Sequence, residues 1–152
     1  MTRGNARELA VHLIYAREFT GDEPEMVIAT RLQKEYYSQL SQENPVYEDR
    51  PSHAQRAYID NVVMGVANRV DELNDIIGKY SIDWDVARIS KLARAVMQLA
   101  IFEMQNLPDV PTGVAISEAV RIVKLYDSED AGAFVNGILG SFARSLTSEV
   151  EA

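Results

Sequence analysis

Apolar residues recur at helical spacing along most of this chain, and the longest of these stripes is the feature that most constrains the fold. It follows a capping-box pair, Ser52 and Gln55, and ends at Gly78. A second such pair, Asn5 and Glu8, is expected to begin the first helix. A period of about 3.6 residues places one helical face against other helices. The members of the long stripe are Ile59, Val62, Val63, Val66, Val70, Leu73 and Ile77.

Five other segments show the same period, whereas no alternating strand of useful length is present. Residues 41–52 contain Asn44-Pro45 and Arg50-Pro51 and lack any period, so they are expected to form a loop. We therefore predict an all-α fold, a single domain over residues 1–152. Its six helices would form a helical bundle of two packed subdomains separated by the 41–52 loop. The five further helical segments are 6–19, 24–40, 89–108, 114–126 and 134–146.

The polar residues form no catalytic or metal-binding motif. The chain has no cysteine, and its two histidines, His12 and His53, do not have a zinc-binding spacing. We interpret His12 as a packed or half-exposed helix residue and His53 as a solvated first-turn residue, and we predict no metal and no cofactor. Neither a phosphate-binding glycine loop nor a nucleophile elbow is present. The protein is therefore predicted not to be an enzyme; the alternative is a small helical enzyme that uses Glu103 and Glu118.

Charge and hydropathy limit the partners of the chain. Its 15 basic and 23 acidic residues give a net charge of -8, which argues against broad, charge-driven binding of nucleic acid. Any RNA site must therefore be a local patch. No apolar run approaches the roughly 18 residues that cross a bilayer. We expect a cytoplasmic protein with no signal peptide and no contact with a membrane.

The first helical segment contains a local patch of this kind. Arg3, Arg7, Val11 and Tyr15 are spaced by four residues, so they are expected to form one stripe on a single helix face. Arginine pairs with phosphate through two hydrogen bonds, and a tyrosine ring stacks on an unpaired base. The stripe therefore indicates a site for single-stranded RNA; the alternative is that these arginines are merely solvated.

The pair Asn136-Gly137 lies inside the last helical segment, although Asn-Gly is typical of a hairpin turn. Apolar residues continue at helical spacing on both sides of the pair, so packing is expected to override the turn signal. We predict that Gly137 allows a neighbouring helix to approach closely. The Asn136 amide is then expected to satisfy a buried backbone group, which is a structural role; the alternative is a direct contact with a ligand.

The last third of the chain carries the most specific motifs. Residues 109–120 read DVPTGVAISEAV and lead to Lys124, and residues 134–139 read FVNGIL. Near the amino terminus, ARELA at 6–10 leads to Tyr15, and AIFEM occupies 100–104. Together these segments closely resemble the N-utilisation substance B (NusB) family of bacterial transcription antitermination factors.

This resemblance implies an all-α fold of two helical subdomains and binding to boxA-type RNA of ribosomal RNA leaders. It also implies a heterodimer with NusE, a small-subunit ribosomal protein, that joins the RNA polymerase antitermination complex and suppresses premature termination. We assign Glu103 and Glu118 to the partner surface. The positions that correspond to the family's RNA face are Arg3, Arg7, Tyr15, Lys124, Tyr126 and the segment 127–133 with Asp130.

The sequence departs from the family pattern at two places on that face. The basic arm is reduced to Arg3-Gly4-Asn5, and the turn at 128–133 is acidic. Fewer phosphates can be neutralised, so this protein is expected to depend on NusE for tight RNA binding. The alternative is a helical interaction or regulatory module with a weakened or lost RNA site, since similar domains occur attached to RNA methyltransferases. The helical period is equally compatible with a monomer and with a homodimer.

Overall fold

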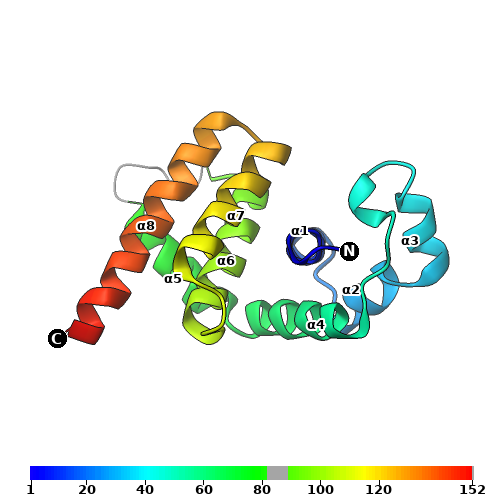
Figure 1. The fold of residues 1–152 in the computed structure, drawn as a ribbon, viewed down its shortest axis with the longest axis horizontal. Coiled ribbons are helices and arrows are strands. Elements are labelled where there is room, and N and C mark those ends of the chain that lie inside the picture. Colours follow the sequence, from blue (N-terminus) through cyan, green and yellow to red (C-terminus); the bar gives the residue numbers. More distant parts are fainter. Residues whose placement is uncertain (82–88, 152) are drawn as a thin grey trace. The chain divides into compact units, whose positions relative to one another are not determined.

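The computed structural model describes residues 1–81 and 89–151, and within these ranges it contains eight α-helices, one short 3₁₀ helix and no strand. The all-α prediction is confirmed. The chain forms two compact units, residues 1–68 and 69–152 (Figure 1). The 41–52 segment therefore belongs to the first unit and does not separate the two.

The first unit is built on the contact between its first and last helices, α1 and α4, with α2 packed against both. Its core includes Leu9 and Leu13 of α1 and Ile59, Val62 and Val63 of α4, all of which are buried. Ile59, Val62 and Val63 are members of the long stripe that the helical period placed on one face. The elements of this unit are α1 (Arg3–Thr20), α2 (Pro24–Arg31), α3 (Lys34–Leu40), η1 (Pro45–Tyr47) and α4 (His53–Asn68).

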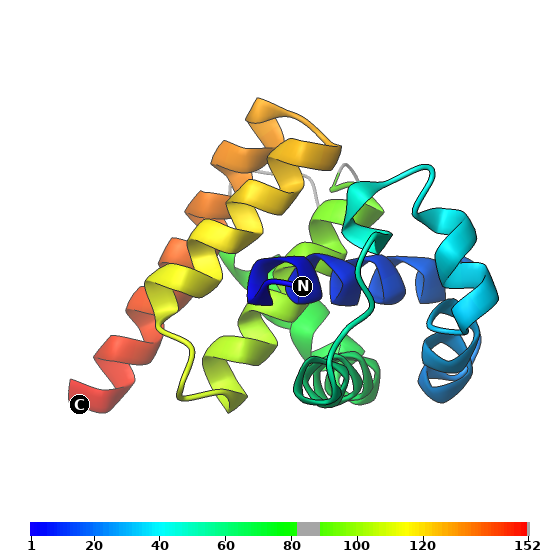
Figure 2. The same ribbon diagram turned by 45° about the vertical axis from the view of Figure 1, so that its right-hand side comes forward.

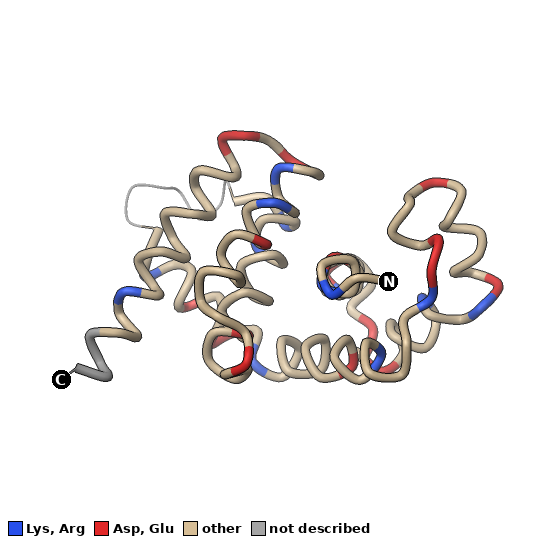
Figure 3. Tube along the Cα trace, in the orientation of Figure 1, with Lys and Arg blue, Asp and Glu red and all other residues tan. Residues whose placement is uncertain are grey.

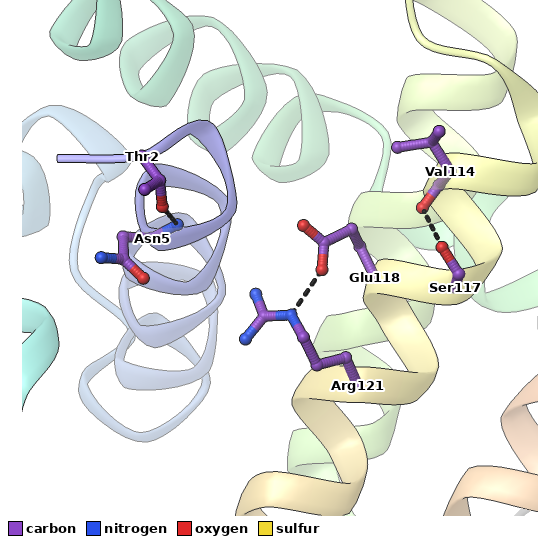
Figure 4. Close-up of polar contacts among 6 residues, drawn as sticks. All are labelled: Thr2, Asn5, Val114, Ser117, Glu118 and Arg121. Carbon is purple, nitrogen blue, oxygen red and sulfur yellow. Dashed lines mark hydrogen bonds and ion pairs between the residues drawn. The ribbon is translucent and has the colours of Figure 1, made fainter.

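Helix α1 begins earlier than the sequence predicted. The Thr2 hydroxyl accepts a hydrogen bond from the backbone N–H of Asn5 at 3.0 Å, so Thr2 is the N-cap (Figure 4). The predicted Asn5–Glu8 capping box is therefore wrong, because Asn5 already lies in the first turn. The helix ends at Gly21, whose φ of 68° lies in the left-handed region that glycine adopts without steric cost.

The predicted helix over residues 24–40 is divided into α2 and α3, and the 41–52 segment contacts both of them. The Arg50 guanidinium donates a hydrogen bond to the Leu32 carbonyl at 3.0 Å, at the break between α2 and α3. The Tyr37 hydroxyl donates to the Asp49 carbonyl at 2.6 Å. Burial raises the pKa of Tyr37 to about 12. Val46 and Tyr47 are buried, so this segment is part of the core, not a free loop.

His12 joins the same segment to α1. Its Nδ1 lies 2.7 Å from the Tyr47 hydroxyl, and the two rings stack with centroids 5.6 Å apart. Burial lowers the pKa of His12, while the nearby Glu8 carboxylate opposes this shift. The interpretation of His12 as a packed or half-exposed helix residue is confirmed, since it is half-buried, and His53 is exposed as expected.

The long stripe from residue 52 to residue 78 is carried by two helices, not one. The Ser52–Gln55 capping box is confirmed, because each backbone N–H is bonded to the other side chain, at 2.9 and 3.2 Å. The helix is interrupted at Arg69, whose φ of -128° and ψ of 21° are not helical. The interruption coincides with the division between the two units. The buried stripe continues across it to Leu73 and Ile77.

The second unit is a group of four helices in which α7 packs along α8, and α6 packs against both (Figures 1 and 2). Its core includes Met97 and Ile101 of α6, Ile122 of α7, and Ile138 and Leu139 of α8. The α7–α8 contact places the end of α7 beside the start of α8, where the predicted site residues lie. The helices are α5 (Val70–Tyr80), α6 (Lys91–Asn106), α7 (Thr112–Tyr126) and α8 (Glu129–Glu151).

Candidate nucleic-acid interface

Three predicted RNA-binding residues, Lys124, Tyr126 and Asp130, come together where α7 turns into α8. Tyr126 is 37% exposed, and its neighbour Leu125 is 61% exposed. Asp130 is exposed in the first turn of α8. Basic and acidic residues gather here (Figure 3). We call this region the turn surface, which consists of Lys124, Leu125, Tyr126, Glu129 and Asp130.

The backbone of the turn surface is held in place by side-chain hydrogen bonds. The Ser90 hydroxyl, which caps α6, donates to the Asp127 carboxylate at 2.8 Å. The Ser128 hydroxyl accepts from the backbone N–H of Ala131 at 3.1 Å and so caps α8. The turn is therefore fixed from both sides. A fixed turn presents the exposed side chains at its edges with little ordering cost when a ligand binds.

Lys124 makes an ion pair across the turn. Its ammonium lies 3.3 Å from the Glu129 carboxylate, and the two side chains are 44% and 84% exposed. Glu129 lies in the predicted segment 127–133, but its pairing with Lys124 was not predicted. Its position in the acidic turn was visible in the sequence, but the pairing with Lys124 depends on how α7 packs on α8.

At the amino terminus, Arg3 is exposed and its guanidinium lies over the Tyr58 ring of α4, 5.1 Å from the ring centroid. The Gln55 side-chain amide also donates a hydrogen bond to the Met1 carbonyl. The basic arm is therefore held against α4. Sequence analysis missed Tyr58, because no local pattern links it to Arg3; only the packing of α1 on α4 brings them together.

The other members of the predicted α1 stripe are not all at the surface. Arg7 is only 4% exposed, and Val11 is buried, whereas Tyr15 is half-buried with its ring edge against Phe19 at 4.8 Å between centroids. The expectation of one surface stripe is therefore wrong for Arg7 and Val11. The reason is that residues 6 to 11 of α1 are all buried, so this part of the helix has no solvated face. A contact between Arg7 and RNA stays a prediction.

The two carboxylates assigned to a partner surface differ. Glu103 is 0% exposed in the last turn of α6, so it offers no surface to a partner in this conformation. A carboxylate at such depth is normally satisfied by hydrogen bonds or opposite charge. Whether Glu103 contacts a partner stays a prediction. Glu118 is partly buried and pairs with Arg121 one turn later in α7 (Figure 4). Whether Glu118 contacts a partner stays a prediction.

The structural role predicted for Asn136 and Gly137 is wrong. Both residues are exposed, and a Cβ placed on Gly137 would meet nothing within 4 Å. Helix α8 buries Val135, Ile138 and Leu139, so the two residues between them face the opposite side. The close approach between helices occurs instead at Gly132, in the first turn of α8.

Among the described residues, no group of three histidine or acidic side chains is placed to hold a metal ion. In the same part of the chain, no helix is long and apolar enough to cross a membrane. Burial shifts the pKa of His12 and of Tyr37 in the first unit, and neither is among the proposed site residues. The exposed residues provide a cation and an aromatic ring two residues apart at the turn surface, and another cation on α1.

Comparison with known proteins agrees with this architecture. The model of the NusB family matches residues 4–144. A transcription antitermination protein NusB of Sorangium cellulosum is 34% identical over 95% of this chain and 93% of its own length. The corresponding protein of Acetivibrio thermocellus is 37% identical over 95% of this chain and 90% of its own length.

Solved structures give the same result. The NusB protein of T. maritima superposes with a TM-score of 0.77 at 26% identity and covers 95% of this chain and 92% of its own. A chain from a crystal structure of antitermination factors NusB and NusE in complex with dsRNA gives a TM-score of 0.73 at 22% identity, covering 94% and 96%. At 22% identity, the second match supports the fold alone. The family match over nearly the whole chain shows that this protein belongs to the NusB family.

Proposed function

We propose that this protein is a transcription antitermination factor that binds single-stranded, boxA-type RNA of ribosomal RNA leaders together with NusE. The observation that carries the proposal is the turn surface, where Lys124 and the exposed ring of Tyr126 lie two residues apart at the end of α7, next to a turn fixed by hydrogen bonds. Family membership supports it, because relatives carry the name transcription antitermination protein.

Each side chain of the proposed surface has a chemical role toward RNA. The Lys124 ammonium neutralises a phosphate, and the Tyr126 ring stacks on an unpaired base. The Asp130 carboxylate accepts a hydrogen bond from a base amino group. On the first unit, Arg3 offers a guanidinium to a second phosphate, with Tyr15 as a further ring and Arg7 as a residue that supports α1 from within.

NusE is the proposed protein partner, and it supplies RNA contacts that this chain lacks. The net charge of -8 is unfavourable for binding RNA alone, whereas a basic ribosomal protein is attracted to an acidic surface. The heterodimer would then join the RNA polymerase antitermination complex and suppress premature termination of ribosomal RNA transcription. Because this activity acts on nascent RNA, we place it in the cytoplasm.

A titration with boxA-like RNA and a scrambled control RNA, with and without NusE, tests the proposal. The complex should bind boxA-like RNA more tightly than the chain alone. Its log affinity should also fall more steeply with log salt, because more counterions leave the RNA when two proteins share the contact. Equal affinity and equal slope with and without NusE would mean that the partner adds no RNA contacts.

The same titration addresses a second candidate function, a helical interaction module without an RNA site. The ion pair between Lys124 and Glu129 and the acidic turn around it favour this reading. If NusE binds but neither the chain nor the complex distinguishes boxA-like RNA from the scrambled control, the protein is such a module.

A further inference from the structure

The Lys124 side chain is positioned by α8 as well as by α7, on which it lies. Its ammonium is 3.3 Å from the Glu129 carboxylate, in the first turn of α8. The same ammonium is the group that the proposed function assigns to an RNA phosphate. A phosphate and the Glu129 carboxylate are both anionic acceptors, so they compete for the same hydrogens.

The stem of Lys124 lies over Gly132, one turn into α8. A Cβ at position 132 would be 2.7 Å from Cε and 2.8 Å from Cγ of Lys124, which is closer than real atoms approach. Only glycine therefore leaves room for the lysine stem in this position. The crowded atoms belong to a flexible side chain, so a methyl group at 132 would displace the Lys124 side chain and leave the helix in place.

We infer that Glu129 is an internal competitor of RNA for Lys124, and that Gly132 is the positioning residue that allows this ion pair to form. The inference rests on the proposed RNA-binding function and adds a regulating contact to it. Exposed ion pairs are weak, so the competition lowers RNA affinity by about two- to five-fold and does not abolish binding. Any condition that weakens the pair would release Lys124 for phosphate.

The substitution Glu129→Gln tests the competition, because it removes the charge and keeps the shape of the side chain. In a titration with boxA-like single-stranded RNA, affinity should rise about two- to five-fold. Asp109→Asn is the matched control, since it removes one exposed negative charge from the connection before α7 and leaves the pair intact. In a Lys124→Ala background, Glu129→Gln should raise the RNA affinity by no more than the control Asp109→Asn does.

Gly132→Ala provides a second, independent test. Alanine favours a helix over glycine, so the melting temperature should not fall, but the Lys124 stem is displaced and the pair is lost. In the Gly132→Ala background, Glu129→Gln should then raise the RNA affinity by no more than Asp109→Asn does. Equal gains from Glu129→Gln and Asp109→Asn, combined with weaker binding by Lys124→Ala, would overturn the inference and leave the proposed function intact. Unchanged binding by Lys124→Ala would instead remove Lys124 from the RNA surface and overturn the inference with it.

Discussion

Helix α1 and the turn surface both carry cations that the sequence assigned to RNA, but these cations differ in their exposure to solvent. In α1, Arg7 is 4% exposed, whereas Arg3 is exposed to solvent. At the turn surface, the Lys124 side chain is 44% exposed and its neighbour Tyr126 is also open to solvent. A basic residue on a helix is therefore available to a ligand only where the helix keeps a solvated face.

The comparison predicts its largest effect at Arg7. Arg7→Ala removes a buried charged side chain and leaves its surroundings without their partner, which costs on the order of 3 kcal/mol in the free energy of unfolding. Arg3→Ala, in the same helix but exposed, is the matched control and should change stability by less than about 0.5 kcal/mol. Chemical denaturation of both variants measures the difference. Equal stability of the two variants would show that Arg7 is a surface residue.

The next effect concerns RNA binding at the turn surface. Tyr126→Ala should weaken binding of boxA-like RNA by about 1 to 3 kcal/mol, because a stacked base loses its aromatic platform. Leu125→Ala is the control, since it removes an even more exposed apolar side chain that cannot stack. If both substitutions have the same effect on the dissociation constant, stacking on Tyr126 is not the contact.

A smaller effect is expected at Tyr58, which holds the Arg3 guanidinium against α4. Tyr58→Leu keeps an apolar side chain but removes the cation–π contact, so RNA affinity should fall by about 0.5 to 1 kcal/mol. The loss should disappear in an Arg3→Ala background, because the two residues then no longer act together. Additive losses in this double-mutant cycle would mean that Tyr58 does not act through Arg3.

The smallest effect is a pH dependence of stability from His12. Burial lowers the pKa of His12 in the folded state, so the unfolded chain binds the proton more tightly. The contribution of neutral His12 to the free energy of unfolding is therefore present above about pH 6.5 and is lost as the pH falls below that value. The effect is small because Glu8 opposes the shift. His12→Gln should flatten the unfolding free energy between pH 6.5 and lower pH relative to the parent, whereas the exposed His53→Gln should not. Parallel profiles for the parent and His12→Gln would contradict this assignment.

The sequence determined the helical class and the buried faces, because a period of about 3.6 residues fixes which side chains share a face. It also determined the Ser52–Gln55 cap, which depends on groups three residues apart. The family was recognisable from motifs such as FVNGIL at 134–139, and the family match confirms that resemblance. All of these features are local in the chain.

What only the tertiary structure decided depends on contacts between distant residues. The period could not show that the helix breaks at Arg69, because the buried stripe continues across the break. It could not show that α2 and α3 are separate helices, or that the Arg50 guanidinium donates a hydrogen bond to the Leu32 carbonyl at the break between them. Nor could it separate the buried Arg7 from the exposed Arg3, since a regular spacing defines a face but not what covers that face. The contact of Lys124 with Glu129 over Gly132 arises in the same way, from α7 packing on α8.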